Sequence, residues 1–328
     1  MIKDKNQFRI VFMGTPEFAL TSLQYLIDSQ YNVVAIVTVP DKPAGRGLKI
    51  IESPIKKYAK ENNIECLQPE KLKADDFVQT LTNLSADLFV VVAFRMLPET
   101  VWSIPKYGTI NLHASLLPQY RGAAPINHAI INGEKITGVT TFFINKEIDK
   151  GNIIDFEKIE ITETDDAETL HDKLAITGAA LLLKTIDNIR NGNITELKQD
   201  NIITKDLKIA PKIHKTDCAI DFNKDINVVY NFIRGLSPYP GAYSNIYREN
   251  KEPLFIKIYK TKINNNYSGE CIPGNIISDN KSFLYISSKN GWLEILELQI
   301  ASKKKMNIKE FFNGNKIDEN SYCFNLEI

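Results

Sequence analysis

Cysteine and long apolar runs are both scarce in this chain of 328 residues. The four cysteines lie far apart, with no C-x-x-C pair among them. This spacing excludes a zinc ribbon and gives no sign of a disulfide framework, so we expect a cytoplasmic location. No stretch approaches the roughly 18 consecutive apolar residues of a membrane-spanning helix, and no membrane partner is expected. The first residues also lack the pattern of a secretory signal.

Charge of one sign is not in excess, because 40 Lys and Arg balance 40 Asp and Glu. The balance hides an uneven distribution. Residues 207–328 contain 17 basic and 13 acidic side chains, whereas residues 1–206 contain 23 and 27. A mildly basic carboxyl-terminal part is compatible with RNA contact, although a solvated basic surface is the commoner explanation.

Strand-like and helical segments alternate through the first part of the chain. Residues 8–13 form an apolar run, residues 16–29 have helical spacing and residues 31–39 are rich in β-branched side chains, which predicts a βαβ unit. Further strands are expected at 86–94, 109–113 and 138–144, and further helices at 53–62, 72–84, 125–132 and 165–190. This alternation predicts an α/β fold with a Rossmann-like, doubly wound and mostly parallel sheet.

The pattern changes after residue 190. Residues 191–206 are polar and weakly patterned, which predicts a linker between a domain at 1–190 and a second, smaller domain at 207–328. In the second domain a helix is expected at 225–235. Short strands follow at 253–262, 274–278, 283–288 and 292–299, separated by turn signals. This spacing predicts a small β-barrel or sandwich.

A single glycine, Gly14, follows the first predicted strand. Dinucleotide binding requires the spacing G-x-G-x-x-G, in which additional glycines let the backbone approach a pyrophosphate. Here Pro16 and Glu17 occupy the space where phosphate would lie. The turn therefore argues against a dinucleotide site.

Asn111 and His113 form a better candidate site. They are two residues apart in a predicted strand, so their side chains emerge on one face. They also lie at the carboxyl end of that strand, where open α/β sheets place their ligands. A structural asparagine beside a satisfied histidine is the alternative. The sequence SLLPQYRGAAP at 115–125 favours a functional site, because this irregular loop builds no regular core.

Asp149, within I-D-K-G at 148–151, adds a carboxylate. An amide, an imidazole and a carboxylate suffice for acyl transfer to an amine. The amide can stabilise an oxyanion, worth about 3–4 kcal/mol per donor. The imidazole can accept the amine proton, and the carboxylate can fix the imidazole tautomer. Nucleophilic catalysis by serine is the rival, but no serine lies in a G-x-S-x-G motif. The four histidines form no H-E-x-x-H motif, so no metal is predicted.

Several motifs then occur in an order that belongs to one known family. They are MGTPEFA at 13–19, DKPAGRG at 41–47, the segment 111–126, TGVT at 137–140, IDKG at 148–151, APKI at 210–213, DCAIDF at 217–222 and IRGLSPYPGAY at 233–243. With them the chain closely resembles the methionyl-tRNA formyltransferases, which formylate initiator tRNA. The remaining residues have the length of that family's barrel domain.

The resemblance implies a reaction and its residues. The formyl group of the co-substrate 10-formyltetrahydrofolate would pass to the α-amino group of methionyl-initiator tRNA, for translation initiation, without a metal or an obligatory protein partner. The catalytic residues implied are Asn111, His113 and Asp149. Folate contacts fall on Leu117, Pro118, Gln119, Tyr120, Arg95, Met96 and Leu97. Contacts with tRNA fall on Lys42, Arg46 and Lys49, and the second domain is expected to be OB-like.

The chain departs from the commoner family pattern at a few positions. Arg95 stands where many members carry glycine, and residues 94–98 look more like the folate loop of glycinamide ribonucleotide formyltransferase. Glu147 replaces a glycine, Asn152 an acidic residue and Phe222 a tryptophan. None of these differences removes a catalytic group.

Other interpretations stay open. A related folate-dependent formyltransferase acting on a small amine, such as a nucleotide-linked amino sugar, would share the catalytic residues but lack the basic loop around Arg46. A noncatalytic RNA-binding protein would need only the carboxyl-terminal part. A simpler interpretation places Arg46 in a surface turn without a partner. In the same way it treats Lys303–Lys305 as a solvated run of charged residues.

Overall fold

The computed structural model describes residues 4–44, 49–202, 206–318 and 320–324. The chain divides into two compact units. The first unit contains Met1–Ala123, Ile136–Glu160 and His171–Ala210, and the second contains Ala124–Lys135, Ile161–Leu170 and Pro211–Ile328. The domain boundaries predicted at 190 and 207 stay a prediction.

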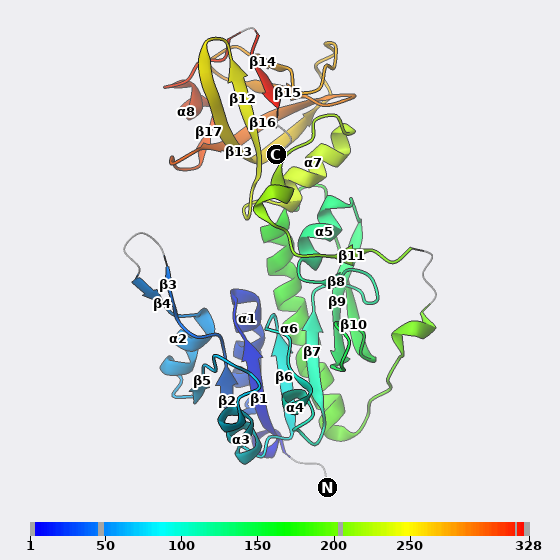
Figure 1. The fold of residues 1–328 in the computed structure, drawn as a ribbon. Coiled ribbons are helices and arrows are strands. Elements are labelled where there is room, and N and C mark those ends of the chain that lie inside the picture. Colours follow the sequence, from blue (N-terminus) through cyan, green and yellow to red (C-terminus); the bar gives the residue numbers. More distant parts are fainter. Residues whose placement is uncertain (1–3, 45–48, 203–205, 319, 325–328) are drawn as a thin grey trace. The chain divides into compact units, whose positions relative to one another are not determined.

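A seven-stranded sheet forms the centre of the first unit, in the order β10-β9-β7-β6-β1-β2-β5 (Figure 1). The five strands from β7 to β5 are parallel, whereas β9 runs antiparallel to both β7 and β10. The strands of the sheet are β1 (Arg9–Gly14), β2 (Asn32–Val37), β5 (Cys66–Leu67), β6 (Leu88–Val92), β7 (Thr109–His113), β9 (Ile136–Phe143) and β10 (Ile153–Glu160). The predicted α/β class with a mostly parallel, doubly wound sheet is therefore confirmed.

The apolar sequences of the central strands explain their position. All five residues of β6 are buried, as are all but the first of β1, because helices cover strands of this kind on both faces. One core cluster joins residues of β1, β2 and β6 to Phe77 and Leu81. The helices of this unit are α1 (Glu17–Asp28), α2 (Pro54–Glu61), α3 (Asp75–Asn83), α4 (Glu99–Trp102) and α6 (Ala167–Asn191), with 3-10 turns η1 (Lys5–Gln7) and η2 (Gln199–Asn201). Helix α6 belongs to this unit from His171 onward.

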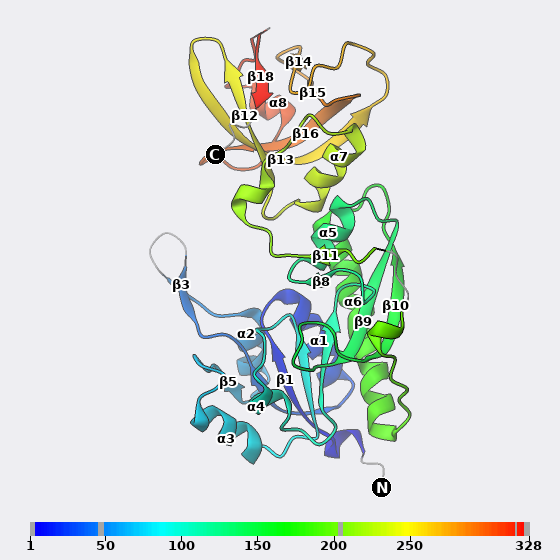
Figure 2. The same ribbon diagram turned by 45° about the vertical axis from the view of Figure 1, so that its right-hand side comes forward.

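Two small strand pairs lie outside this sheet. Strands β3 (Lys42–Ala44) and β4 (Lys49–Ile51) form an antiparallel hairpin that projects from the rest of the first unit (Figure 2). Strands β8 (Arg121–Gly122) and β11 (Ile209–Ala210) form a parallel pair. The glycine, proline and basic residues of 40–50 are typical of a loop, and the sequence does not indicate the hairpin because its strands are very short.

The second unit contains a nearly closed antiparallel β-barrel, as the sequence pattern predicts. Its strand order is β14-β15-β16-β13-β12-β18, with β17 beside β16. The ends of this path meet where Asn275 bridges Tyr322 and the Cys323 amide donates to the Gly274 carbonyl at 2.7 Å. Gly274 has φ +86°, and a Cβ there would lie 2.2 Å from the Cys323 carbonyl oxygen. Only glycine fits this closure.

The barrel strands and helices of the second unit follow these bounds: β12 (Ala242–Arg248), β13 (Lys251–Asn264), β14 (Ile276–Ser278), β15 (Leu284–Ser287), β16 (Trp292–Ile300), β17 (Met306–Asn307), β18 (Tyr322–Phe324), α5 (Pro125–Ile131), η3 (Lys215–Cys218), α7 (Ile226–Gly235) and α8 (Ile308–Phe312). Helix α5 packs on α7, where the Asn127 side chain donates to the Gly235 carbonyl at 2.7 Å. A core cluster that includes Ile256, Ile258 and Leu298 fills the barrel.

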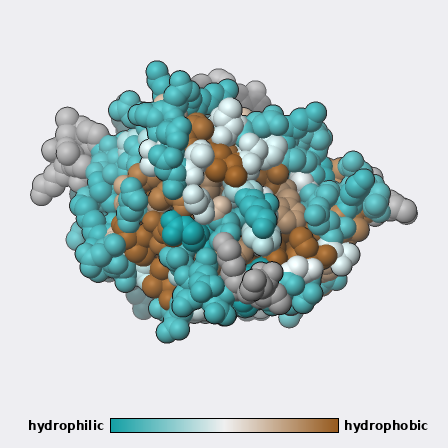
Figure 3. Space-filling view, turned by 90° about the horizontal axis from the view of Figure 1, so that it is seen from below, coloured by the Kyte–Doolittle hydropathy of each residue, from teal (hydrophilic) through white to brown (hydrophobic). Residues whose placement is uncertain are grey.

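The surface is mixed in character. Figure 3 shows hydrophilic side chains over most of one face, with hydrophobic ones in several small groups. Exposed apolar residues scattered in this way are common on folded proteins. Among the helices in the described ranges, none combines the length and the apolar character needed to span a membrane.

Candidate active site

Asn111 and His113 lie at the carboxyl end of β7. This strand is held on both sides, because Asn111 is in register with Val91 of β6 and with Phe142 of β9. Two bonded neighbours fix the strand, so the period of two places both side chains on one face. Asn111 is half-buried, and its amide makes no hydrogen bond to any of the described residues. The amide can therefore donate to a ligand.

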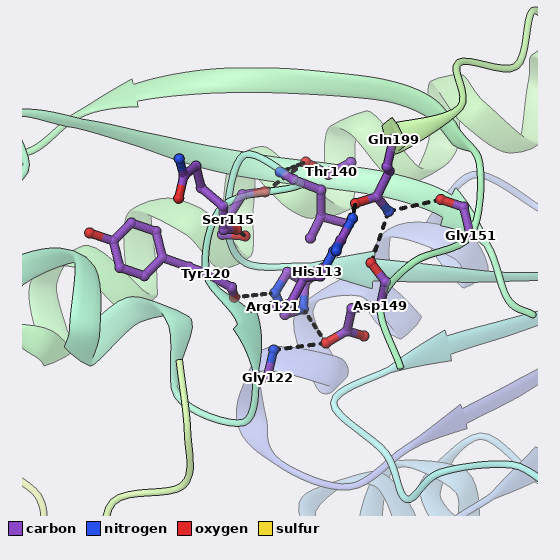
Figure 4. Close-up of polar contacts among 11 residues, drawn as sticks. His113, Ser115, Tyr120, Arg121, Gly122, Thr140, Asp149, Gly151 and Gln199 are labelled. Atoms are coloured by element: carbon purple, nitrogen blue, oxygen red, sulfur yellow. Dashed lines mark hydrogen bonds and ion pairs between the residues drawn. The ribbon is translucent and has the colours of Figure 1, made fainter. Parts of the chain in front are cut away.

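His113 is buried and held at one ring nitrogen (Figure 4). Its Nε2 lies 2.9 Å from the carbonyl oxygen of Tyr120. Because a carbonyl oxygen only accepts, Nε2 donates and carries a hydrogen. The other nitrogen, Nδ1, lies 3.9 Å from Oδ2 of Asp149. The contact with Tyr120 thus directs the Nδ1 edge of the ring toward the carboxylate.

Asp149 is directed by contacts with the backbone of another segment. Its Oδ2 accepts from the Gly122 amide at 2.9 Å, and its own φ is +53°. Two residues on, a Cβ at Gly151 would lie 1.6 Å from the Phe143 carbonyl oxygen, so only glycine fits there. The structure therefore brings His113 and Asp149 together from β7 and a distant loop, as the sequence motifs predict.

Hydrogen bonds that the sequence did not indicate organise the loop after β7. Thr140 Oγ1 donates to the Ser115 carbonyl at 2.6 Å and accepts from the Leu117 amide at 3.1 Å. Ser115 Oγ donates to the Gln119 carbonyl at 2.6 Å. Gln199 binds the Asp149 loop from the predicted linker. A polar residue in a weakly patterned segment carries no signal of such a role.

The predicted folate segment at 117–120 uses most of its side chains internally. Leu117 precedes a cis peptide bond to Pro118 and packs with Phe142 and Ile153. Pro118 and Tyr120 are buried. The Gln119 side chain donates to the Asp206 carbonyl and accepts from the Lys208 amide, both at 2.8 Å. Folate contacts by these four residues stay a prediction.

The second predicted folate segment, at 95–97, points its side chains in different directions. Arg95 donates to the carbonyl oxygens of Pro69 at 2.8 Å and Glu70 at 3.2 Å. Burial lowers the pKa of the Arg95 guanidinium. Met96 is 74% exposed, whereas Leu97 belongs to the core of the sheet. Met96 is thus the most exposed of the three.

The predicted tRNA contacts lie on the β3–β4 hairpin. Lys42 begins β3 and is exposed, Lys49 begins β4, and Arg46 lies outside the described residues. Before β3, Asp41 binds the ammonium of Lys56 and accepts from Gln68 at 2.8 Å. These two bonds hold the pKa of Asp41 below its ordinary value. Partly exposed charges therefore anchor the hairpin at its base.

Comparison with known proteins gives the same family that the sequence motifs indicate. Residues 8–186 match the model of the formyl transferase family, and residues 212–316 match that of the formyl transferase C-terminal domain. The methionyl-tRNA formyltransferase of Bacteroides thetaiotaomicron is 47% identical over 96% of this chain and 98% of its own length. That of Azobacteroides pseudotrichonymphae is 50% identical over 94% of this chain and 96% of its own.

A solved structure gives a more distant likeness. The N-formyltransferase of Helicobacter canadensis, in complex with folinic acid and dTDP-3-aminofucose, has a TM-score of 0.63. It is 23% identical, covering 90% of this chain and 99% of its own, which shows a shared fold alone. The family models and the two bacterial relatives decide the family: this chain belongs to the methionyl-tRNA formyltransferases.

Proposed function

We propose that this chain transfers the formyl group of 10-formyltetrahydrofolate to the α-amino group of methionyl-initiator tRNA, for translation initiation. The observation that carries the proposal is the meeting of His113 and Asp149 on the strand face that also presents the Asn111 side-chain amide, which bonds to none of the described residues. The relatives with 47% and 50% identity carry the name of this activity.

The side chains of Asn111, His113 and Asp149 are suited to acyl transfer to nitrogen. When bound, 10-formyltetrahydrofolate supplies a formyl group on N10. The amine forms a bond to the formyl carbon, the bond from that carbon to N10 breaks, and N10 takes up a proton as tetrahydrofolate leaves. The Asn111 amide donates toward the formyl oxygen, where negative charge develops during attack. This is the role for which a half-buried N–H donor with no hydrogen bond to the described residues is suited.

His113 and Asp149 manage the proton that the attacking amine loses. Because Nε2 of His113 is committed to the Tyr120 carbonyl, proton exchange falls to Nδ1. The Asp149 carboxylate faces that nitrogen and stabilises the charge that the ring gains with a proton. The acceptor α-amine has a pKa of about 7.7–8 or lower, so a useful neutral fraction exists near pH 7.

The hairpin and the barrel are the parts that we assign to tRNA. Lys42, Arg46 and Lys49 would meet phosphates of the acceptor end, since cationic side chains bind the phosphate backbone of a nucleic acid without reading its sequence. Residues 207–328, with 17 basic and 13 acidic side chains, would add a weak attraction. We assign the enzyme to the cytoplasm, without a membrane or an obligatory protein partner, and place the domain boundaries near 190 and 207.

One assay tests the function. The purified chain is given 10-formyltetrahydrofolate with charged initiator tRNA, free methionine or a nucleotide-linked amino sugar. We expect formylation of the methionyl-tRNA at a kcat/KM at least 100-fold above that of the other amines, about 2.7 kcal/mol of discrimination. Preferential formylation of the amino sugar would contradict the proposal and favour the small-amine alternative.

A further inference from the structure

We propose that Gln199 is a positioning residue for formyl transfer, because its side chain fixes the backbone that carries Asp149. This inference rests on the proposed function. Gln199 begins η2, in the segment that the sequence predicts as a linker, and it belongs to the same compact unit as Asp149 and Arg121.

The Gln199 side chain is buried, with 4% exposed, and it uses its full hydrogen-bonding capacity. Its Nε2 donates to the carbonyl oxygens of Asp149 and Gly151, both at 2.8 Å. Its Oε1 accepts from Nε and Nη2 of Arg121 at 3.0 and 2.6 Å (Figure 4). Since a carbonyl only accepts and a guanidinium only donates, these four bonds allow a single orientation of the amide.

The loop that carries Asp149 depends on such support. Residues 145–148 and Lys150 are partly or fully exposed, whereas Asp149 is half-buried. Its φ of +53° is a left-handed conformation, which a non-glycine residue keeps only where its surroundings determine it. The Gly122 amide holds the carboxylate, and Gln199 holds the carbonyl of the same residue. Gln199 therefore controls the backbone from which the carboxylate faces His113.

The contacts close a ring between the two segments that carry the site. Gly122 binds the Asp149 carboxylate, Asp149 binds Gln199, Gln199 binds Arg121, and Arg121 is bonded covalently to Gly122. A ring of this kind transmits a change at Gln199 to both the backbone carbonyl and the carboxylate of Asp149.

The segment that contains Gln199 is anchored to the first unit at two places. Before Gln199, Leu197 and Ile153 exchange two backbone hydrogen bonds, of 2.8 and 2.9 Å. After it, Ile209 and Ala210 of β11 pair with Arg121 and Gly122 of β8. The two bonds at Leu197 support the backbone that carries the Gln199 side chain, as a positioning residue needs.

A double-mutant cycle tests the proposal. Gln199→Leu removes all four bonds, and we expect kcat for formylation of methionyl-tRNA to fall about 10- to 100-fold, as for outer contacts of active-site groups. KM values for folate and tRNA should change little. In an Asp149→Ala background the same substitution should cause no further loss, because Gln199 acts through Asp149. A loss of equal size in both backgrounds would overturn the proposal.

Gln199→Glu serves where Gln199→Leu fails to fold. The glutamate side chain keeps the volume of glutamine and an oxygen that accepts from Arg121. It also places a carboxylate oxygen against the carbonyl oxygens of Asp149 and Gly151, which repel it, so kcat should again fall. Asn201→Asp is the matched control, since it makes the same amide-to-carboxylate change at an exposed position of η2, and we expect activity within about twofold of wild type.

The outcomes distinguish a failure of this inference from a failure of the proposed function. If the wild-type chain does not formylate methionyl-tRNA, the proposed function fails; if Asp149→Ala keeps near-normal formylation, the catalytic role of Asp149 fails and the role of Gln199 fails with it. If Asp149→Ala is inactive while Gln199→Glu, folded by circular dichroism, matches wild type in kcat, only the role of Gln199 fails.

Discussion

The Asp149 loop and the β3–β4 hairpin are held in opposite ways. Asp149 and Gln199 make buried or half-buried hydrogen bonds to groups of other segments, and a glycine is forced at residue 151. The hairpin is anchored at its base by partly exposed charges around Asp41 and Lys56. Hydrogen bonds to backbone groups of other segments fix a geometry, whereas ion pairs between partly exposed side chains contribute little to stability. We expect a fixed geometry where the chemistry is proposed to occur and a less constrained element where tRNA is proposed to bind.

The largest effects should come from the catalytic groups. Asn111→Ala removes the amide donor, and we expect kcat to fall about 100- to 1,000-fold, the range for loss of one oxyanion donor. His113→Asn should cost about 100- to 10,000-fold. Initial rates of formylation with saturating substrates measure both.

Neither substitution should unfold the protein, which circular dichroism and thermal melting check. Asn83→Ala, at an exposed position of α3, is the control and should leave kcat unchanged. Near-normal rates for Asn111→Ala would remove the amide from the mechanism.

The next largest effect should come from a change in packing at the Asp149 loop. Gly151→Ala would place a Cβ 1.6 Å from the Phe143 carbonyl oxygen, so the loop must move. We expect a loss of about 1–3 kcal/mol in the free energy of unfolding, as for overpacked sites, together with reduced kcat. Urea denaturation and formylation rates measure the two effects.

Gly314→Ala is the matched control, because none of the described residues lies within 4 Å of a Cβ there. Its unfolding free energy should stay within about 0.5 kcal/mol of wild type. If both alanine variants behave alike, the Asp149 loop is less constrained than its contacts indicate.

Substitutions on the hairpin should change binding and leave the chemistry intact. For Arg46→Ala, Lys42→Ala and Lys49→Ala we expect KM for tRNA to rise with kcat nearly unchanged. The slope of log(kcat/KM) against log salt should fall by roughly 1 for each phosphate that the variant no longer neutralises. An unchanged salt slope for Arg46→Ala would support a surface turn without a partner.

The smallest effect should come from the base of the hairpin. Asp41→Asn removes a carboxylate whose pKa is lowered by Lys56 and Gln68. A lowered pKa contributes stability above the unfolded value of about 3.9, and this contribution is lost as pH falls through the lower folded value. Urea midpoints of wild type and variant should therefore differ slightly at pH 7 and converge below about pH 4. A gap that widens in acid would contradict the assignment.

Periodicity and motif order predicted much of the fold from the sequence. The apolar runs of β1 and β6 and the two-residue spacing of Asn111 and His113 are local signals, and the structure places both residues on β7. Strand β10 was missed because its sequence, IIDFEKIE, is polar and half-exposed at the edge of the sheet. Gln199 was missed for a different reason. Its partner Asp149 is 50 residues away, and only tertiary structure joins them.

Side-chain direction was also beyond the sequence. Residues 95–97 form one motif, yet Arg95 turns to the Pro69 carbonyl, Met96 faces solvent and Leu97 enters the core. A motif gives the position of a segment along the chain, whereas packing around it decides which atoms are left for a ligand.

The coupling between His113 and Asp149 is the most direct measure of the proposed chemistry. Single-turnover formylation of methionyl-initiator tRNA would be compared for His113→Asn, Asp149→Asn and the double variant. Groups that act as a unit are strongly non-additive, so we predict that the double variant is about as slow as the slower single variant. Losses that multiply would show two independent residues and contradict a joint role.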